Sequence, residues 1–234
     1  MFLSSPYLQA SLLAVSEQAT TIVAVISAVA AVLLFAVIAL LCIGSNKRYD
    51  AKRIAFAGVT VGLSFALSFV KVSPVTSGGS VTLASMLPLL LYAYFYGARD
   101  GLLVGVIFGL LNFLSGPWIL TPMTFVLDYP LAYASIALMG FAKKFGKNPL
   151  LQVILGVLAV YAFRFSCHFF SGVIYFMENS IWVDFPDWAL SGPFVYSFIY
   201  QCLYLPLDML ITLGAFIPLA TTKVLQRMQA ILKN

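Results

Sequence analysis

Asp128 and His168 are ionisable residues in the middle of apolar segments. A charge or an imidazole at the depth of a lipid bilayer is unfavourable, so such a residue normally faces a cavity or a partner and marks a functional site. Both residues have aromatic neighbours along the chain. We therefore expect the two side chains to line one polar pocket, in the outer half of a membrane.

Three more side chains are expected to join this pocket. Arg164, His168 and Gly172 recur every fourth residue and so share one face of a helix. Gly172 leaves room for a flat ring against the backbone, and His168 can stack or hydrogen-bond. Tyr196 and Gln201 would add a hydroxyl and an amide from the last apolar segment. The alternative is that His168 is a core residue whose hydrogen bonds are satisfied within the protein.

Asp128 precedes Tyr129 and Pro130, and a proline inside a helix bends it and frees a backbone carbonyl. The carboxylate would receive an amino group or balance a cation on the ligand. The alternative is a partner within the chain, such as Arg164. For Asp208, which follows another proline by two residues, we expect bonding to backbone groups freed by that proline.

The composition predicts an all-α polytopic membrane protein. Hydrophobic residues make up 62% of the chain and charged residues 9%, whereas soluble domains carry roughly 25% charged residues. Three dispersed cysteines and one histidine indicate neither a disulfide framework nor a metal site. No nucleophile elbow, nucleotide-binding loop or zinc signature is present. We expect no catalytic residues, no cofactor and no nucleic-acid partner.

Seven membrane spans are predicted from apolar runs of about the ~20 residues that cross a bilayer. They cover residues 20–43, 53–71, 82–97, 101–115, 121–142, 149–176 and 191–221. The first span is expected to be retained rather than cleaved as a signal peptide, because no Lys or Arg precedes it. Residues 1–51 would form an extension with this extra helix, and residues 52–234 a six-helix domain.

The basic residues predict the orientation, because cytoplasmic loops are enriched in Lys and Arg. With the N-terminus outside and the C-terminus inside, all but two of the 13 basic residues fall at the inner side; Lys71 and Arg164 lie at or within spans. The loop 115–122 is then external, and its Trp118, between two prolines, is a candidate lid over the pocket. Trp182 and Trp188 suit an interfacial aromatic belt.

Small residues line one face of the predicted 53–71 helix, and such a face lets another helix approach closely. They are Ala55, Gly58, Gly62 and Ala66. The sequence leaves two alternatives open: packing within this chain, and docking of a separate membrane protein.

Four segments, taken in order, resemble the substrate-binding membrane subunits (S-components) of energy-coupling-factor transporters, most closely the thiamine-specific ones. They are residues 79–88, 101–111, 127–133 and 168–175. The resemblance implies a bundle of six helices, a thiamine pocket near the outer face, and docking of a coupling subunit through the small-residue face.

The resemblance also assigns residues to the ligand. It places the pocket acid and its aromatic neighbour at Asp128 and Tyr129, and it implies ligand-binding positions at Arg164, His168, Gly172, Phe176, Tyr196 and Gln201. Compared with the usual family pattern, Asp128 replaces a Glu, and residues 72–81 lack the Trp that the first outer loop usually offers.

We therefore expect a multi-pass protein of a bacterial plasma membrane that binds thiamine or a close relative and is not an enzyme. Its partners would be a membrane coupling subunit and ATPase subunits. The alternatives are an S-component for another small heteroaromatic vitamin or an ion-coupled carrier acting alone, with Asp128 and His168 as a proton relay. An intramembrane enzyme or an assembly factor is a further alternative.

Overall fold

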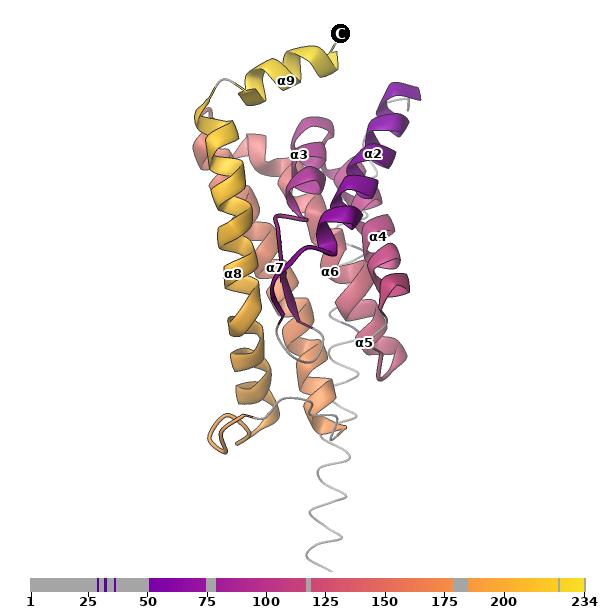
Figure 1. Ribbon diagram of the computed structural model, residues 1–234, viewed down its shortest axis with the longest axis vertical. Helices are drawn as coiled ribbons and strands as arrows, with labels where there is room; N and C mark the ends of the chain where they lie inside the picture. Colours follow the sequence, from indigo (N-terminus) through magenta and orange to yellow (C-terminus); the bar gives the residue numbers. More distant parts are fainter. Residues whose placement is uncertain are drawn as a thin grey trace, which may run out of the picture.

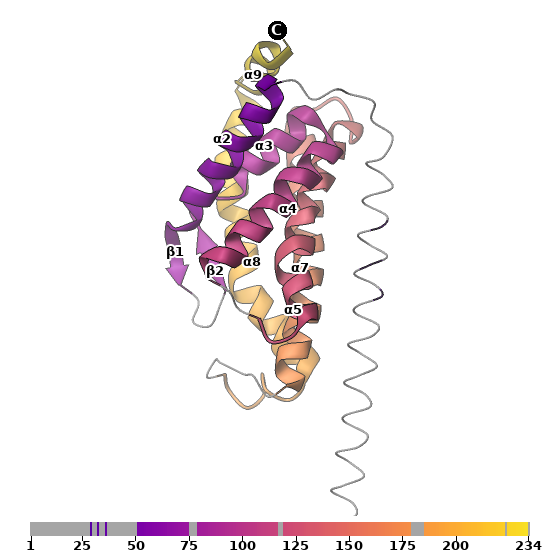
Figure 2. The same cartoon turned by 90° about the vertical axis from the view of Figure 1, so that its right-hand side faces the viewer.

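The computed structural model describes the chain from residue 51 onward, with short gaps. The described ranges are 51–74, 79–116, 119–178, 185–222 and 224–233, with three single positions between 29 and 36. Apart from those three positions and residue 51, the predicted first span and the predicted N-terminal extension therefore lie outside the described residues. Figures 1 and 2 show the described part as a bundle of helices, most of which run along the long axis of the molecule.

Five stretches of the described chain are long and apolar enough to cross a membrane. They are α2 (Ala51–Ser68), α4 (Ala98–Ser115), the composite stretch Pro122–Lys144, α7 (Pro149–Met177) and α8 (Pro193–Thr221). Each matches a predicted span to within a few residues at its ends, where helix assignments commonly vary. The predicted mostly helical membrane bundle is confirmed; the count of seven spans is not confirmed, and the orientation stays a prediction.

The prediction of a spanning helix over residues 82–97 is wrong. Helix α3 (Leu87–Tyr96) has 10 residues and is about 15 Å long, half of the ~30 Å hydrocarbon core. Its apolar side chains are instead inside the bundle, where Leu89 and Leu90 have no exposed surface. The chain before it is a strand and a turn, because the backbone N–H of Thr82 is bonded to Asp208 on α8.

A two-stranded hairpin stands where a loop was predicted. Strands β1 (Lys71–Pro74) and β2 (Ser80–Thr82) pair antiparallel, with Lys71 opposite Thr82. The hairpin is held against α8 by two hydrogen bonds: the N–H of Gly79 donates to the Tyr200 hydroxyl (2.8 Å) and the N–H of Thr82 donates to Asp208 Oδ1 (3.1 Å). It therefore fixes the chain between α2 and α3 beside α8.

The predicted 121–142 span is not a uniform α-helix. It consists of α5 (Pro122–Val126), the π-helical turn η1 (Leu127–Leu131), α6 (Ala132–Ala134) and the 3-10 helix η2 (Ser135–Lys144). Pro130 lies inside the π-helical turn and has no N–H to donate. The expected distortion at this proline is confirmed, and Asp128 is part of the widened turn.

Glycines let α4 lie directly against the composite stretch. A Cβ atom added at Gly105 would overlap the carbonyl oxygen of Tyr133, and one added at Gly109 would lie 2.6 Å from the carbonyl oxygen of Tyr129. Small residues four apart on a helix allow this backbone approach. The contact sets the position of the turn that carries Asp128.

The two ends of the bundle differ in charge. Helix α2 begins, and α8 ends, at the end across which the C-terminal helix α9 (Val224–Lys233) lies (Figure 1). Basic residues gather in the elements and loops at this end, namely Lys52, Arg53, Arg99, Lys143, Lys144, Lys147 and Arg227. Helix α9 was not predicted; it is joined to α2 by a hydrogen bond from Lys52 Nζ to the Ile231 carbonyl (3.3 Å).

Candidate functional site

A cavity of about 470 Å³ is lined by residues of α2, the hairpin, α4, η1, α6, α7 and α8. Its volume falls within the roughly 300–1,000 Å³ of small-molecule sites. The cavity wall includes most of the residues predicted for the site, namely Asp128, Tyr129, Arg164, His168, Gly172, Tyr196 and Gln201. The distorted η1 turn and two long helices thus bring together residues from three separate spans.

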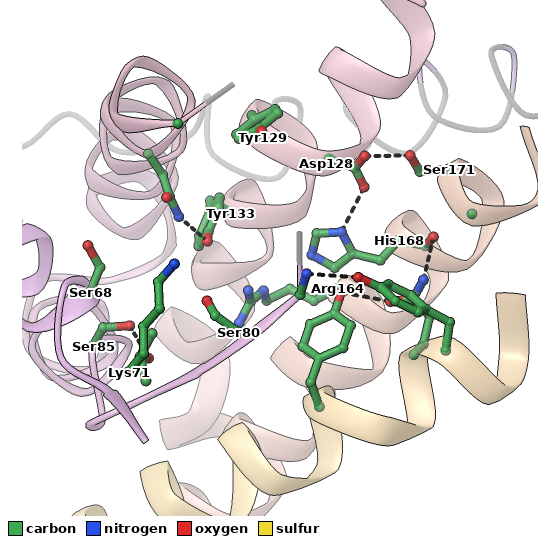
Figure 3. A pocket seen from close by; sticks show the side chains of 18 of the residues that line it. Ser68, Lys71, Ser80, Ser85, Asp128, Tyr129, Tyr133, Arg164, His168 and Ser171 are labelled. Atoms are coloured by element: carbon green, nitrogen blue, oxygen red, sulfur yellow. Dashed lines mark hydrogen bonds and ion pairs between the residues drawn. The ribbon is translucent and has the colours of Figure 1, made fainter. Parts of the chain in front are cut away.

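Asp128 and His168 face each other in the cavity wall (Figure 3). The His168 Nδ1 atom lies 2.8 Å from Asp128 Oδ1, and the Ser171 hydroxyl donates to Asp128 Oδ2 at 2.5 Å. His168 Nε2 is buried and has no hydrogen-bond partner among the described residues. Since the carboxylate holds Nδ1, the ring is oriented and Nε2 is left for a ligand.

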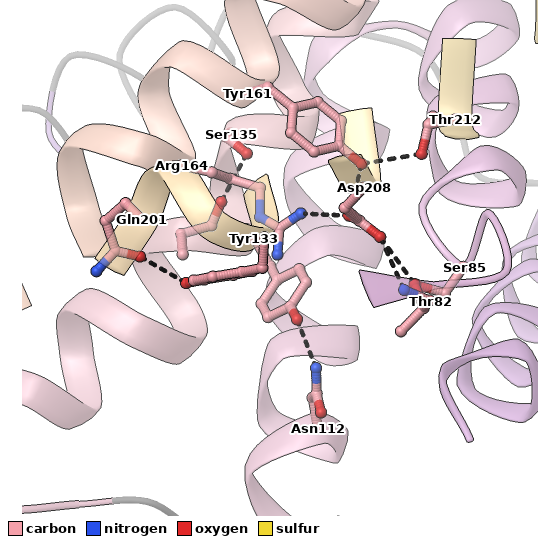
Figure 4. A network of polar contacts seen from close by, with 12 residues as sticks. Thr82, Ser85, Asn112, Tyr133, Ser135, Tyr161, Arg164, Gln201, Asp208 and Thr212 are labelled. Atoms are coloured by element: carbon pink, nitrogen blue, oxygen red, sulfur yellow. Dashed lines mark hydrogen bonds and ion pairs between the residues drawn. The ribbon is translucent and has the colours of Figure 1, made fainter. Parts of the chain in front are cut away.

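Asp128 does have partners within the chain, as the alternative held, but they are His168 and Ser171 and not Arg164. Its Nη1 atom lies 3.5 Å from Asp208 Oδ2, in an ion pair with little exposed surface on either side chain (Figure 4). The guanidinium carbon lies 4.8 Å from the ring centre of Tyr133 and 5.4 Å from that of Tyr161. Arg164 Nε and Nη1 have no hydrogen-bond acceptor among the described residues.

Asp208 has a different role from the predicted bonding to freed backbone. It accepts from Thr82, through the backbone N–H (3.1 Å) and the hydroxyl (3.0 Å), and from the Tyr161 hydroxyl (2.7 Å). Figure 4 shows this carboxylate between the hairpin and the two long helices. Its partners come from β2 and α7 as well as from Arg164, so it joins the elements behind the cavity wall.

Gly172 and Gln201 shape the contact between α7 and α8. A Cβ atom at Gly172 would overlap the Ser197 hydroxyl oxygen, so the glycine is needed for the close approach of α8. The Gln201 amide donates to the His168 carbonyl (3.1 Å) and accepts from the Tyr204 hydroxyl (2.7 Å). The nitrogen and the oxygen of this amide are therefore both hydrogen-bonded within the cavity wall.

Aromatic rings line the side of the cavity formed by α8. The rings of Tyr196 and Tyr200 are stacked, with centres 6.1 Å apart and an interplanar angle of 15°. Phe176 is not part of the cavity wall; its ring lies 5.4 Å from that of Tyr196 and backs it. The predicted lid residue Trp118 lies outside the described residues, as does Trp182. Trp188 is exposed over 66% of its surface.

The cavity wall also contains residues that the sequence analysis did not assign to it. They include Lys71, Asn112, Tyr133, Ser171, Tyr175, Tyr200 and Tyr204. The four-residue spacing of Tyr196, Tyr200 and Tyr204 was a signal for a shared helical face. In the sequence, Lys71 stands out only as one of two basic residues that lie outside the predicted inner loops. The sequence placed residues 72–81 above the pocket as an outer loop but did not indicate that they form a hairpin whose residues line the cavity.

The small-residue face of α2 is exposed. Ala55, Gly58, Gly62 and Ala66 all have open surface. A Cβ atom added at Gly58 or Gly62 meets nothing within 4 Å in the described part of the protein. The alternative of packing within the chain is therefore not supported by any described residue.

The cavity suits a ring that carries a positive charge. It combines the Asp128 carboxylate with a free imidazole nitrogen of His168 and with the faces of Tyr196 and Tyr200. Aromatic faces attract a cation by about 0.5–2 kcal/mol each. A carboxylate has about four lone-pair sites, so Asp128 can accept from a ligand in addition to its two present partners.

The chain is similar to known thiamine transporters. The profile of the thiamine transporter protein family (Thia_YuaJ) matches residues 54–227. The thiamine transporter ThiT of Bacillus subtilis (strain 168) is 28% identical over 138 residues, which cover 55% of this chain and 68% of that protein. A solved structure of ThiT from Listeria monocytogenes has a TM-score of 0.50 and 22% identity, covering 74% of this chain and 96% of that one; this likeness concerns the fold.

Proposed function

Because the chain belongs to the thiamine transporter protein family, we propose that it binds thiamine in the cavity described above and works as the membrane S-component of an ATP-driven energy-coupling-factor transporter. Its relatives are named as transporters, and the chain is a multi-pass membrane transporter rather than an enzyme. A relative from Bacillus supports a bacterial plasma membrane as its location.

The observation that carries the thiamine assignment is the hydrogen-bonded Asp128–His168 pair in the cavity wall. Thiamine consists of an aminopyrimidine joined to a permanently cationic thiazolium ring. The amino group would donate to Asp128, and His168 Nε2 would bond a ring nitrogen or the amino group. The cationic ring would lie against the tyrosine faces of α8, where its charge is favoured.

The proposed coupling to ATPase subunits rests on the open face of α2. Ala55, Gly58, Gly62 and Ala66 offer a surface without protruding side chains, as helix–helix contacts in membranes require. The sequence has no nucleotide-binding loop of its own. In this proposal the face docks a membrane coupling subunit, and ATP hydrolysis by further subunits drives release of thiamine.

Titration calorimetry of the purified full chain with thiamine tests the binding step. The experiment uses no ion gradient and no partner, and we expect saturable one-to-one binding. Mass spectrometry of small molecules that co-purify with the protein gives an independent reading of the ligand. Absence of thiamine in both measurements would overturn the proposed function.

Uptake experiments separate this function from an ion-coupled carrier that acts alone. Proteoliposomes that contain only this chain should not accumulate thiamine under a proton or sodium gradient, because the energy would come from ATPase subunits. Accumulation by the chain alone would favour the ion-coupled carrier, and accumulation under a proton gradient would favour Asp128 and His168 as its proton relay.

A further inference from the structure

Helix α9 lies across one end of the bundle. Figure 1 shows it almost at right angles to α8, and Figure 2 shows it nearly end-on, so it runs transverse to the long helices. Helix α8 has 29 residues and is therefore about 44 Å long, close to the roughly 40–45 Å of a bilayer with its headgroup regions. Because α9 begins at Val224, just after α8 ends at Thr221, it lies at the depth of the headgroups when α8 spans the membrane.

The apolar residues of α9 fall on one face of the helix. They are Val224, Leu225, Met228 and Ile231, at the spacing of an amphipathic helix. Leu225 is 3% exposed and belongs to the main core, so this face is turned toward the bundle, whereas Ile231 near the other end of α9 is 64% exposed. A helix of 10 residues is marginal in water and depends on the packing of its apolar face. The described part of the bundle does not supply that packing at Ile231.

The charges around α9 are positive. Arg227 is exposed beside the apolar face, and Lys52 reaches α9 through its hydrogen bond to the Ile231 carbonyl (3.3 Å). Among the described residues at this end of the bundle, Asp100 is the only acidic one, and it is buried in an ion pair with Arg53. Basic side chains beside an apolar helical face suit a membrane surface that contains anionic lipids.

We propose that α9 is an interfacial helix that binds an anionic lipid surface, with Met228 and Ile231 toward the acyl chains and Arg227 among the headgroups. Such helices bury their apolar face about 5–10 Å into the boundary between headgroups and acyl chains. A docked protein would cover the same apolar residues, but its binding would not follow the charge of the lipid. The inference concerns a surface remote from the cavity and does not depend on which ligand the cavity binds.

Amide hydrogen exchange of α9 tests the proposal, because exchange follows the local opening of a helix. The full chain is placed in lipid nanodiscs of phosphatidylcholine alone, and in nanodiscs that also contain the anionic lipid phosphatidylglycerol. Wild type is compared with Arg227→Gln, which removes the charge, with Arg227→Lys, which keeps it, and with Ile231→Ser, which removes the exposed apolar side chain. The amides of α7 serve as the internal reference for a folded bundle.

We expect α9 of the wild type to exchange more slowly in the anionic nanodiscs than in the neutral ones. Arg227→Gln should lose about fivefold of this protection in the anionic nanodiscs only, the usual contribution of one basic residue near an anionic surface. Arg227→Lys should keep the protection, and Ile231→Ser should lose protection in both kinds of nanodisc. Salt at about 1 M should remove the difference between the lipids, because it screens charges beyond about 3 Å.

The wild type alone can overturn the proposal. Equal exchange of its α9 amides in neutral and anionic nanodiscs would show that the helix is held by protein contacts and not by an anionic surface. If Arg227→Gln and Arg227→Lys lose protection equally, charge is not the cause and the proposal is wrong. Wild-type protection in Ile231→Ser would contradict insertion of the apolar face. None of these outcomes bears on thiamine binding, which is measured separately.

Discussion

Asp128 is held by two side chains of α7, and they fix what it offers to a ligand. His168 and Ser171 occupy one lone pair on each oxygen at 2.8 Å and 2.5 Å. The carboxylate is thereby oriented before a ligand arrives, and an ordered group loses less conformational entropy on binding. The remaining lone pairs face the cavity, which makes the charge of Asp128 the first quantity to test.

Asp128→Asn should weaken thiamine binding by about ten- to a hundredfold, or 1.5–3 kcal/mol, because the hydrogen bond to the ligand loses its charge. Asparagine keeps the size of the side chain and can still accept from Ser171. Asp187→Asn makes the same change of charge on the exposed turn before α8 and serves as the control. Titration calorimetry measures both; wild-type affinity in Asp128→Asn would remove this residue from the site.

The Arg164–Asp208 pair predicts an effect on stability rather than on the ligand alone. Asp208→Leu leaves Arg164 buried without its partner, which typically costs about 3–5 kcal/mol. Replacing both residues, as Arg164→Met with Asp208→Leu, removes the unpaired charge and should restore part of that loss. The measurement is the melting temperature in detergent. If the double variant is less stable than Asp208→Leu, the unpaired charge of Arg164 is not the cause of the lost stability.

At the scale of elements, the distorted span is what positions the site. Within Pro122–Lys144 the backbone passes from α-helix through a π-helical turn to a 3-10 helix, with Pro130 in the turn. Single π-helical turns inside helices are frequently found at functional sites. Here the turn directs Asp128 toward α7 while Tyr129 and Tyr133 pack against α4.

The glycine contact between α4 and this span can be tested by one methyl group. Gly105→Ala would press its Cβ against the backbone of Tyr133 and should destabilise the protein by about 1–3 kcal/mol, the usual cost of overpacking. Gly214→Ala is the matched control, because nothing lies within 4 Å of the added atom and alanine is the better helix former by up to about 1 kcal/mol. The measurement is the melting temperature of both variants. Equal melting temperatures for Gly105→Ala and Gly214→Ala would mean that α4 can shift to accommodate the added methyl group.

At the scale of the whole molecule, the protein separates two tasks along its long axis. The residues that line the cavity lie mostly in the half of the bundle away from α9, whereas the basic residues other than Lys71 and Arg164 gather near α9. The small-residue face of α2 does not line the cavity; within α2 only Ser68, at the end of the helix, does so. Ligand binding and partner docking are therefore expected to be separable by mutation.

Gly58→Trp and Gly62→Trp should block thiamine uptake in cells that carry the coupling subunits and leave thiamine binding by the purified chain unaffected. Both positions are open, so the indole does not clash within the described protein but would obstruct an approaching helix. Leu63→Trp is the control, because this residue is also exposed but lies outside the small-residue face. Loss of binding together with uptake would contradict a docking role.

The sequence alone determined the class of the protein and the position of most helices. Spans are readable because the bilayer requires about 20 apolar residues per helix and leaves no backbone group unpaired. Helical spacing also placed Arg164, His168 and Gly172 on one face of a helix. Asp128 stood out as a charged residue within an apolar segment. All four residues lie in the cavity wall. These properties are local along the chain, so a sequence can show them.

Only the tertiary structure decided which side chains pair. Arg164 was a candidate partner for Asp128 but pairs with Asp208, and Asp208 bonds Thr82 in a hairpin 126 residues earlier. Helix α3 is short and Lys71 reaches the cavity because the chain before α3 is bound to α8. Such contacts join segments far apart in sequence, and their partners depend on how the helices pack, which no periodicity along the chain records.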